Sequence, residues 1–203
     1  MTSVLNPPQP VLGARVGSGY FVGVIDVKGD LFAIVVAPKA EGEKLGRWLS
    51  PSADVPGAAS YFDGLANTNA MAKAGSELAT WAQSVCIDGL GGWYIPARDE
   101  LELLYRHLKP TDDESSSFSG DNPSSLPPGY PYGPNHAPTT VDAFKRRRSD
   151  AFSPEWYWSS TQFSRHDAWG QTFDLGCQYD GDKSWEARCR LVRRVLLSDL
   201  VIE

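Results

Sequence analysis

Two adjacent hydroxyl side chains, Ser159 and Ser160, lie in the segment EWYWSST and are the first candidates for nucleophilic chemistry. An activated serine needs a neighbouring base, and the chain has only three histidines, at positions 107, 136 and 166. The G-x-S-x-G motif of many hydrolases surrounds neither serine. Small hydroxyl residues beside large aromatic residues are also typical of a buried strand. We favour this second interpretation, which predicts a core segment and a protein that is not an enzyme.

Metal and disulfide chemistry both depend on the cysteines, which are Cys86, Cys177 and Cys189. Zinc sites use Cys and His ligands at short spacings, and these three cysteines are far apart. Their odd number makes a disulfide framework a poor interpretation, so we expect free thiols, with Cys177 and Cys189 buried. Asp180 and Asp182 flank a glycine, but a D-x-D sequence in a turn is a weak calcium signal. We therefore predict no metal and no cofactor.

A recognition surface is the alternative kind of site, and the segment SLPPGYPYGPNHAP offers one. Tyr130, Tyr132, Asn135 and His136 lie in it, on a backbone stiffened by prolines. Aromatic and amide side chains on a stiff loop bind a partner at low entropic cost. The tyrosines could instead pin the loop to the body of the protein, and the sequence leaves both interpretations open. For the basic run at 145–148 we favour a solvated loop over an anion-binding site.

The composition sets the class of protein that must position these residues. The chain has 203 residues, of which 41% are hydrophobic and 22% charged, as expected for a globular protein. Its formal net charge of -6 disfavours binding to nucleic acid. The chain contains no run of about 18 apolar residues, so we expect no membrane span. The start, MTSVLNPPQP, lacks the basic and apolar regions of a signal peptide, so we expect synthesis in the cytoplasm.

Proline and glycine divide the chain into an arm and a domain. Residues 1–10 are predicted to form a flexible arm, and residues 11–203 a single domain. Residues 110–154 carry eight of the 15 prolines of the chain. Structureless loops of this length are usually functional or disordered. We interpret this segment as an insertion displayed at the surface.

Hydrophobic patterns place the regular elements before the loop. Two β-branched runs around a Gly-containing turn indicate a hairpin, and apolar residues at spacings of three and four indicate helices. The predicted elements are a hairpin of residues 20–27 and 31–37, a helix from 67 or 68 to 85, a strand at 93–95 and a helix from 96 to 108.

Alternating apolar residues predict strands after the loop. Residues 169–179 and 185–191 would form a hairpin around residues 180–182, with the odd-numbered side chains pointing inward. The alternation slips at 192–194, which indicates a bulge or the end of a strand. The whole pattern predicts an α+β fold with a mainly antiparallel sheet, two helices and one long inserted loop.

Three segments in the same order also resemble a domain family of unknown function found in phages and at the C-terminus of a bacterial collagen-like adhesin. The family pattern is a Trp before a P-x-x-x-E-L helix, then Y-W-S-S-T, an alternating strand and a last strand with Arg-Cys. In this chain the matching residues are Trp93, Pro96, Glu100, Leu101, Tyr157 to Thr161, Ala168 to Gly176, and Arg188 to Arg193. The resemblance covers about residues 67–195 and implies a C-type-lectin-like fold, with WSST on a core strand.

The resemblance also implies a class of function. It suggests a non-enzymatic recognition module, a phage or prophage virion protein at the tail tip or capsid surface that binds a host-surface ligand. The expected contact residues are Tyr130, Tyr132, Asn135, His136, Arg165 and His166. The alternative is a structural virion component without a host ligand, and an enzyme of the formylglycine-generating type is a third hypothesis. The expected partners are other virion proteins, a bacterial surface glycan or protein, or further copies of the chain.

Overall fold

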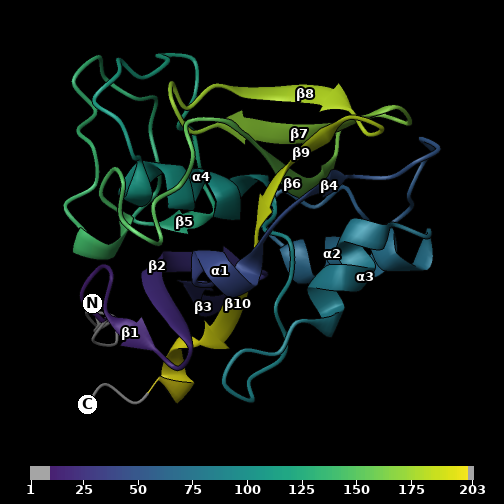
Figure 1. Ribbon diagram of the computed structural model, residues 1–203, viewed down its shortest axis with the longest axis horizontal. Helices are drawn as coiled ribbons and strands as arrows, with labels where there is room; N and C mark the ends of the chain where they lie inside the picture. Colours follow the sequence, from purple (N-terminus) through teal and green to yellow (C-terminus); the bar gives the residue numbers. More distant parts are fainter. Residues whose placement is uncertain (1–9, 201–203) are drawn as a thin grey trace, which may run out of the picture.

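The computed structural model describes residues 10–200, so the predicted arm at residues 1–10 lies outside the described residues except for Pro10. Two sheets and the helices between and beside them make up the molecule (Figure 1). In chain order the elements are β1 (Arg15–Val16), β2 (Gly19–Val27), β3 (Asp30–Val36), α1 (Lys39–Gly42), β4 (Glu43–Arg47), α2 (Gly64–Lys73), α3 (Glu77–Ser84), α4 (Arg98–Leu108), β5 (Ser125–Leu126), a 3-10 helix at Asp142–Phe144, β6 (Trp156–Gln162), β7 (Asp167–Thr172), β8 (Gln178–Asp182), β9 (Glu186–Arg190), β10 (Val192–Leu196) and a 3-10 helix at Leu197–Asp199.

Sheet A contains the predicted N-terminal hairpin, which is confirmed. β2 and β3 pair antiparallel and are joined by Lys28 and Gly29, both of which have positive φ angles. A two-residue turn with two positive φ values matches the twist of the strands that it joins. β1 and β5 pair with β2, and β10 pairs with β3, so that the first and last parts of the described chain share one sheet.

Sheet B has the strand order β4-β9-β6-β7-β8, and β6 pairs with β9 in parallel, whereas the other pairings are antiparallel. The prediction of one strand over 169–179 is wrong, because a turn that contains Gly176 at a φ of 73° divides it into β7 and β8. The predicted hairpin at 180–182 is also wrong, since these residues lie within β8 and pair with β7. β9 pairs instead with β4, far away in the sequence.

The slip predicted at 192–194 marks the point where the chain changes sheets. β9 ends in sheet B at Arg190, and β10 begins in sheet A at Val192. Between them the backbone N–H of Leu191 donates to Gly42, and its carbonyl accepts from Ala37. This one residue therefore connects the two sheets without leaving its peptide groups unpaired.

Four helices occur in the described residues, rather than the two predicted. The predicted helix over 67–85 is divided into α2 and α3 by Gly75, whose φ is 92°, and Ser76 caps α3 by accepting from the backbone N–H of Ala79. The helix predicted from Pro96 is confirmed as α4. Its Glu100 side chain accepts from the backbone N–H of Ala97 and so satisfies one free donor at the start of the helix.

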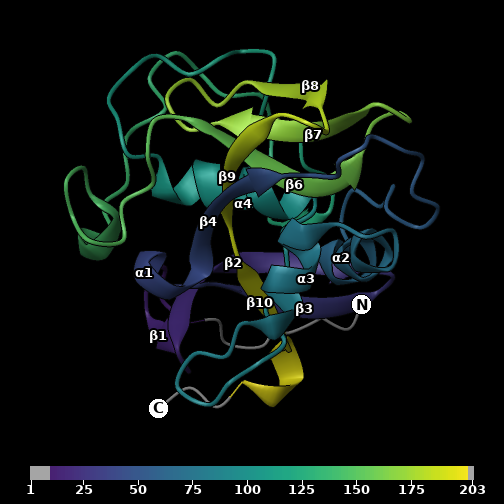
Figure 2. The ribbon, with the colours of Figure 1, turned by 45° about the vertical axis from the view of Figure 1, so that its right-hand side comes forward.

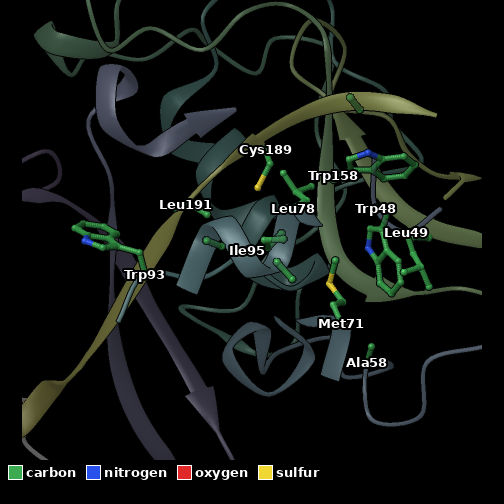
Figure 3. Close-up of a cluster of buried hydrophobic side chains, with 14 of the residues drawn as sticks. Trp48, Leu49, Ala58, Met71, Leu78, Trp93, Ile95, Trp158, Cys189 and Leu191 are labelled. Carbon is green, nitrogen blue, oxygen red and sulfur yellow. The ribbon is translucent and has the colours of Figure 1, made fainter. Parts of the chain in front are cut away.

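The core has two main parts, one on each face of sheet B. Helices α2 and α3 cover one face (Figure 2), where Trp158, Cys189, Leu78 and Met71 belong to one buried cluster (Figure 3). On the other face, Tyr157 and the apolar stripe of α4 pack between sheet B and sheet A. WSST is thus a core segment, as predicted. Within residues 10–200, no helix is long and apolar enough to span a membrane.

Candidate functional site

The candidate serine nucleophiles are hydrogen-bonded to backbone groups within the core. The Oγ of Ser159 donates to the carbonyl of Trp169 at 2.8 Å, and the Oγ of Ser160 donates to the carbonyl of Pro96 at 3.2 Å. Both residues are completely buried. Each hydroxyl proton is already committed to a backbone acceptor, which fits a structural role for the pair.

The cysteines are free, and their burial differs from the prediction. Cys189 is buried, Cys177 is half-buried and Cys86 is exposed. Burial raises the pKa of the Cys189 thiol, so it stays protonated at neutral pH. Among the described residues, no group of three His, Cys, Asp or Glu side chains could hold a metal ion.

A buried carboxylate holds the long loop against the body of the protein. Glu102 of α4 accepts from the Tyr132 hydroxyl at 2.7 Å and from the Asn122 side-chain amide at 2.7 Å. Arg106, one turn further along α4, forms an ion pair with the same carboxylate. A buried charge is stable only when it is paired and hydrogen-bonded; Arg106 of the same helix pairs with Glu102, and residues of the loop supply the other hydrogen bonds.

A buried ammonium group anchors the same loop a second time. Lys109 follows α4 directly and is completely buried. Its Nζ donates to the carbonyl of Asp113, to the Oγ of Ser115 at 3.0 Å and to the carbonyl of His136 at 2.9 Å. The insertion is therefore an ordered layer attached to α4, with buried residues of its own such as Phe144, rather than a segment that is only displayed.

The predicted loop residues divide into buried and exposed ones. Tyr132 is only 6% exposed, and the ring of His136 lies 5.7 Å from that of Tyr105 and 4.8 Å from that of Tyr132. These two residues pin the loop, as one of the two sequence interpretations had it. Tyr130 is 75% exposed and Asn135 is exposed, so both are free to contact a partner.

Arg165 and His166 are exposed on the turn between β6 and β7. The backbone of this turn is held from inside by Lys183, whose Nζ donates to the carbonyls of Ser164 at 2.8 Å and Arg165 at 3.1 Å. The same Nζ donates to the carbonyl of Ala53 at 2.8 Å. Burial lowers the pKa of Lys183 to about 8, which still leaves the amine mostly charged and donating at neutral pH.

The structure does not bring all of the predicted contact residues together. Tyr132 contacts Gln171 near the end of β7, whereas Arg165 and His166 precede the start of this strand. A strand rises about 3.3 Å per residue, so the two groups lie at opposite ends of sheet B. Figure 1 shows the loop on the left of β7 and the β6–β7 turn on the right.

The basic run 145–148 is exposed, as expected for a solvated loop. Asp142 forms ion pairs with Lys145 at 3.1 Å and with Arg148 at 3.7 Å. Both neighbouring cations thus have a carboxylate partner, and they lower the pKa of Asp142.

A hollow of about 330 Å³ on sheet B is a feature that the sequence reasoning missed. We call it the aromatic hollow. It lies on the same face of the sheet as Trp158, and its lining residues are Trp156, Trp158, Tyr179, Asp180, Gly181, Trp185, Glu186 and Ala187.

The aromatic residues at the edge of this hollow contradict the prediction that the odd-numbered side chains point into the core. Tyr179 and Trp185 were expected to point into the core, but they are 56% and 64% exposed. Glycines within the strands make room beside them. A Cβ on Gly170 would lie 2.4 Å from the ring of Trp156, so only glycine lets this ring rest on β7. Isolated glycines in two adjacent strands, Gly170 and Gly181, were the signal that could have revealed the hollow.

The chain matches no protein-family model and no curated protein at a significant level.

Proposed function

We propose that this chain is a non-enzymatic recognition domain with a C-type-lectin-like fold. On this proposal it is a phage or prophage virion protein, at the tail tip or the capsid surface, that binds a host-surface ligand through its loops. The proposed contact residues are Tyr130 and Asn135 on the long loop and Arg165 and His166 on the β6–β7 turn. Tyr132 and His136 support the loop from beneath.

The observation that carries this proposal is the way both loops are held. Glu102 and Lys109 fix the long loop, and Lys183 fixes the β6–β7 turn, in each case from the interior. The outward side chains of the same segments, Tyr130 and Arg165 among them, remain exposed. A loop that is ordered before binding loses little entropy when it binds, and this favours recognition.

The arrangement of the chain supports the lectin-like part of the proposal. Strands β2 and β3, near the start of the described chain, share sheet A with β10, near its end. Helices α2 to α4, the long loop and all strands of sheet B lie between them in the sequence. Such a closed base below a region of loops and a second sheet fits the C-type-lectin-like fold that the sequence motifs imply.

Alanine substitutions test the proposed contacts. We expect Tyr130→Ala with Asn135→Ala, and separately Arg165→Ala with His166→Ala, to weaken binding of the purified protein to whole bacteria at least about tenfold. The melting temperature should stay unchanged, because these side chains are exposed. Lys73→Ala, on the exposed side of α2, is the matched control and should bind normally. Wild-type binding to bacteria that both double variants retain would refute the proposed contacts.

A structural role in the virion is the second candidate, and one observation favours it. Phe118 on the long loop is 92% exposed and Val11 at the start of the described chain is 80% exposed. Apolar side chains of this kind become buried when a protein docks on another one. Protection of both segments from protease only within an assembled particle would favour this role over host recognition.

A further inference from the structure

The aromatic hollow has the composition of a small-ligand site, although none of the predicted contact residues lies in it. Tyr179 and Trp185 expose more than half of their surfaces at its edge, and Trp156, whose ring rests on Gly170 of β7, also lines it. Soluble proteins rarely gather exposed large aromatic residues in one place without a binding role. A volume of about 330 Å³ is at the lower end of the range of about 300–1,000 Å³ for ligand pockets, which suits one or two sugar-sized rings.

The walls of the hollow are held in place before any ligand arrives. The turn that carries Trp185 is closed by Asp182, whose Oδ1 accepts from the backbone N–H of Ser184 at 2.8 Å and from its Oγ at 2.7 Å. The N–H of Trp185 donates to the carbonyl of Asp182 at 2.9 Å. On the opposite side, Trp158 donates from Nε1 to the carbonyl of Gly46. A rigid aromatic surface binds with a small loss of entropy.

The rim of the hollow offers carboxylate acceptors, and a cation beside the rim is paired with one of them. Asp180 and Glu186 are lining residues, and Glu186 lies 3.8 Å from the guanidinium group of Arg47. Arg47 offsets only one of the two acidic side chains, so a ligand that carries carboxylate or phosphate groups is disfavoured. Hydroxyl groups can donate to carboxylates, so they suit this rim.

We propose that the aromatic hollow binds one or two pyranose rings of a saccharide that carries no acidic groups. The flat C–H face of a sugar ring would pack on the side chain of Trp185 or Tyr179, and its hydroxyl groups would reach the carboxylates of Asp180 and Glu186. This proposal goes beyond the recognition function proposed above, because the hollow is a separate site with a ligand class of its own. The backbone of Gly181 forms part of the floor, close to Trp158 and Trp185.

An array of immobilised neutral, amino-bearing and acidic saccharides tests the proposal with the full chain. We expect wild-type protein to bind neutral or amino-bearing members and to ignore acidic ones. Trp185→Ala and Tyr179→Ala should each weaken this binding about tenfold or more, with an unchanged melting temperature. Phe163→Ala is the matched control, since Phe163 is 52% exposed but does not line the hollow, and it should bind like the wild type.

The same variants, tested on whole bacteria, separate this proposal from the recognition function. No saccharide binding by the wild type, or binding that both hollow variants retain, overturns the saccharide proposal. If bacteria are then still bound by the wild type and Trp185→Ala alike, the recognition function survives. If the wild type binds saccharides, Trp185→Ala does not, and the wild type binds no bacteria, the saccharide proposal is supported and the host-surface function is overturned. In a further outcome, Trp185→Ala loses the binding to cells, and protease treatment of the cells abolishes the binding of the wild type. This outcome points to a protein ligand and also overturns the saccharide proposal.

Discussion

Two tyrosines that are two positions apart in the long loop have opposite roles. Tyr130 is exposed, whereas the hydroxyl of Tyr132 donates to the buried carboxylate of Glu102 and accepts from the side-chain amide of Gln171 at 3.3 Å. Both lie between prolines in the sequence, and nothing local separates them. Their difference comes from Glu102, which lies 30 residues away from Tyr132 in the chain.

We expect Tyr132→Phe to lower the free energy of unfolding by about 1–3 kcal/mol, because the buried Glu102 loses a hydrogen-bond donor. Tyr130→Phe is the matched control and should leave the free energy of unfolding unchanged, since its side chain is exposed. Urea denaturation of the two variants measures both values. Equal effects of the two substitutions would contradict the assignment of Tyr132 as the pin.

The sequence does not show which charged residues are buried. The core strand with WSST was predicted to bury Tyr157 or Trp158, and both are buried. Arg190 is buried as well, in an ion pair with Glu43 at 2.8 Å, although an alternating strand with charged residues predicts it on the surface. Its partner lies 147 residues earlier, so no local pattern contains this information.

At the scale of the elements, two local signals gave correct predictions, whereas a third local signal and the pairing of distant strands did not. The hairpin of β2 and β3 follows from its turn, and α4 follows from Pro96 and its apolar stripe. The predicted helix over 67–85 was wrong because its stripe continues across Gly75, where the backbone breaks. The hairpin predicted between the C-terminal strands was wrong because alternation fixes the face of a residue but not its partner strand.

The start of α4 should make the stability of the protein depend on pH. Burial raises the pKa of Glu100 from 4.5 to about 7, even though Tyr94 and the N–H of Ala97 both donate to its carboxylate. A raised pKa means that the folded state binds more protons than the unfolded state between these values. The stabilising contribution is therefore present below about pH 4.5 and lost as the pH rises through about 7.

A comparison with Glu100→Gln isolates this contribution, because glutamine does not titrate. We expect the stability of the wild type, relative to the variant, to fall by up to about 3 kcal/mol between pH 4.5 and pH 8. Chemical denaturation at several pH values provides the measurement. Two parallel stability curves would show that Glu100 does not titrate in this window.

At the scale of the whole molecule, α4 connects the parts that recognition would use. It lies between the two sheets and supplies the buried Glu102 that holds the long loop (Figure 2). At the far end of sheet B, Lys183 joins the segment at Ala53 to the β6–β7 turn. The two proposed contact surfaces are thus held independently, each by a charge in the interior.

Replacement of Lys183 by methionine should loosen one end of the molecule and leave the other unchanged. Several acceptors would lose their donor, at a cost of about 1–3 kcal/mol. We expect the amides of Phe163 and Ser164 to exchange with deuterium roughly tenfold faster, and the amide of Tyr132 to exchange at its wild-type rate. Lys73→Met is the control. Uniformly faster exchange would instead show that Lys183 stabilises the whole fold.

The bonds of Lys183 have a consequence for how this protein can change. Three of its four acceptors, at positions 53, 164 and 165, are main-chain carbonyl oxygens, which every amino acid possesses. The interior lysine therefore holds the β6–β7 turn through main-chain atoms, and mutations at positions 165 and 166 leave these acceptors in place. The exposed side chains of such a turn can therefore change, during evolution or in a randomised laboratory library, while its backbone keeps the same shape.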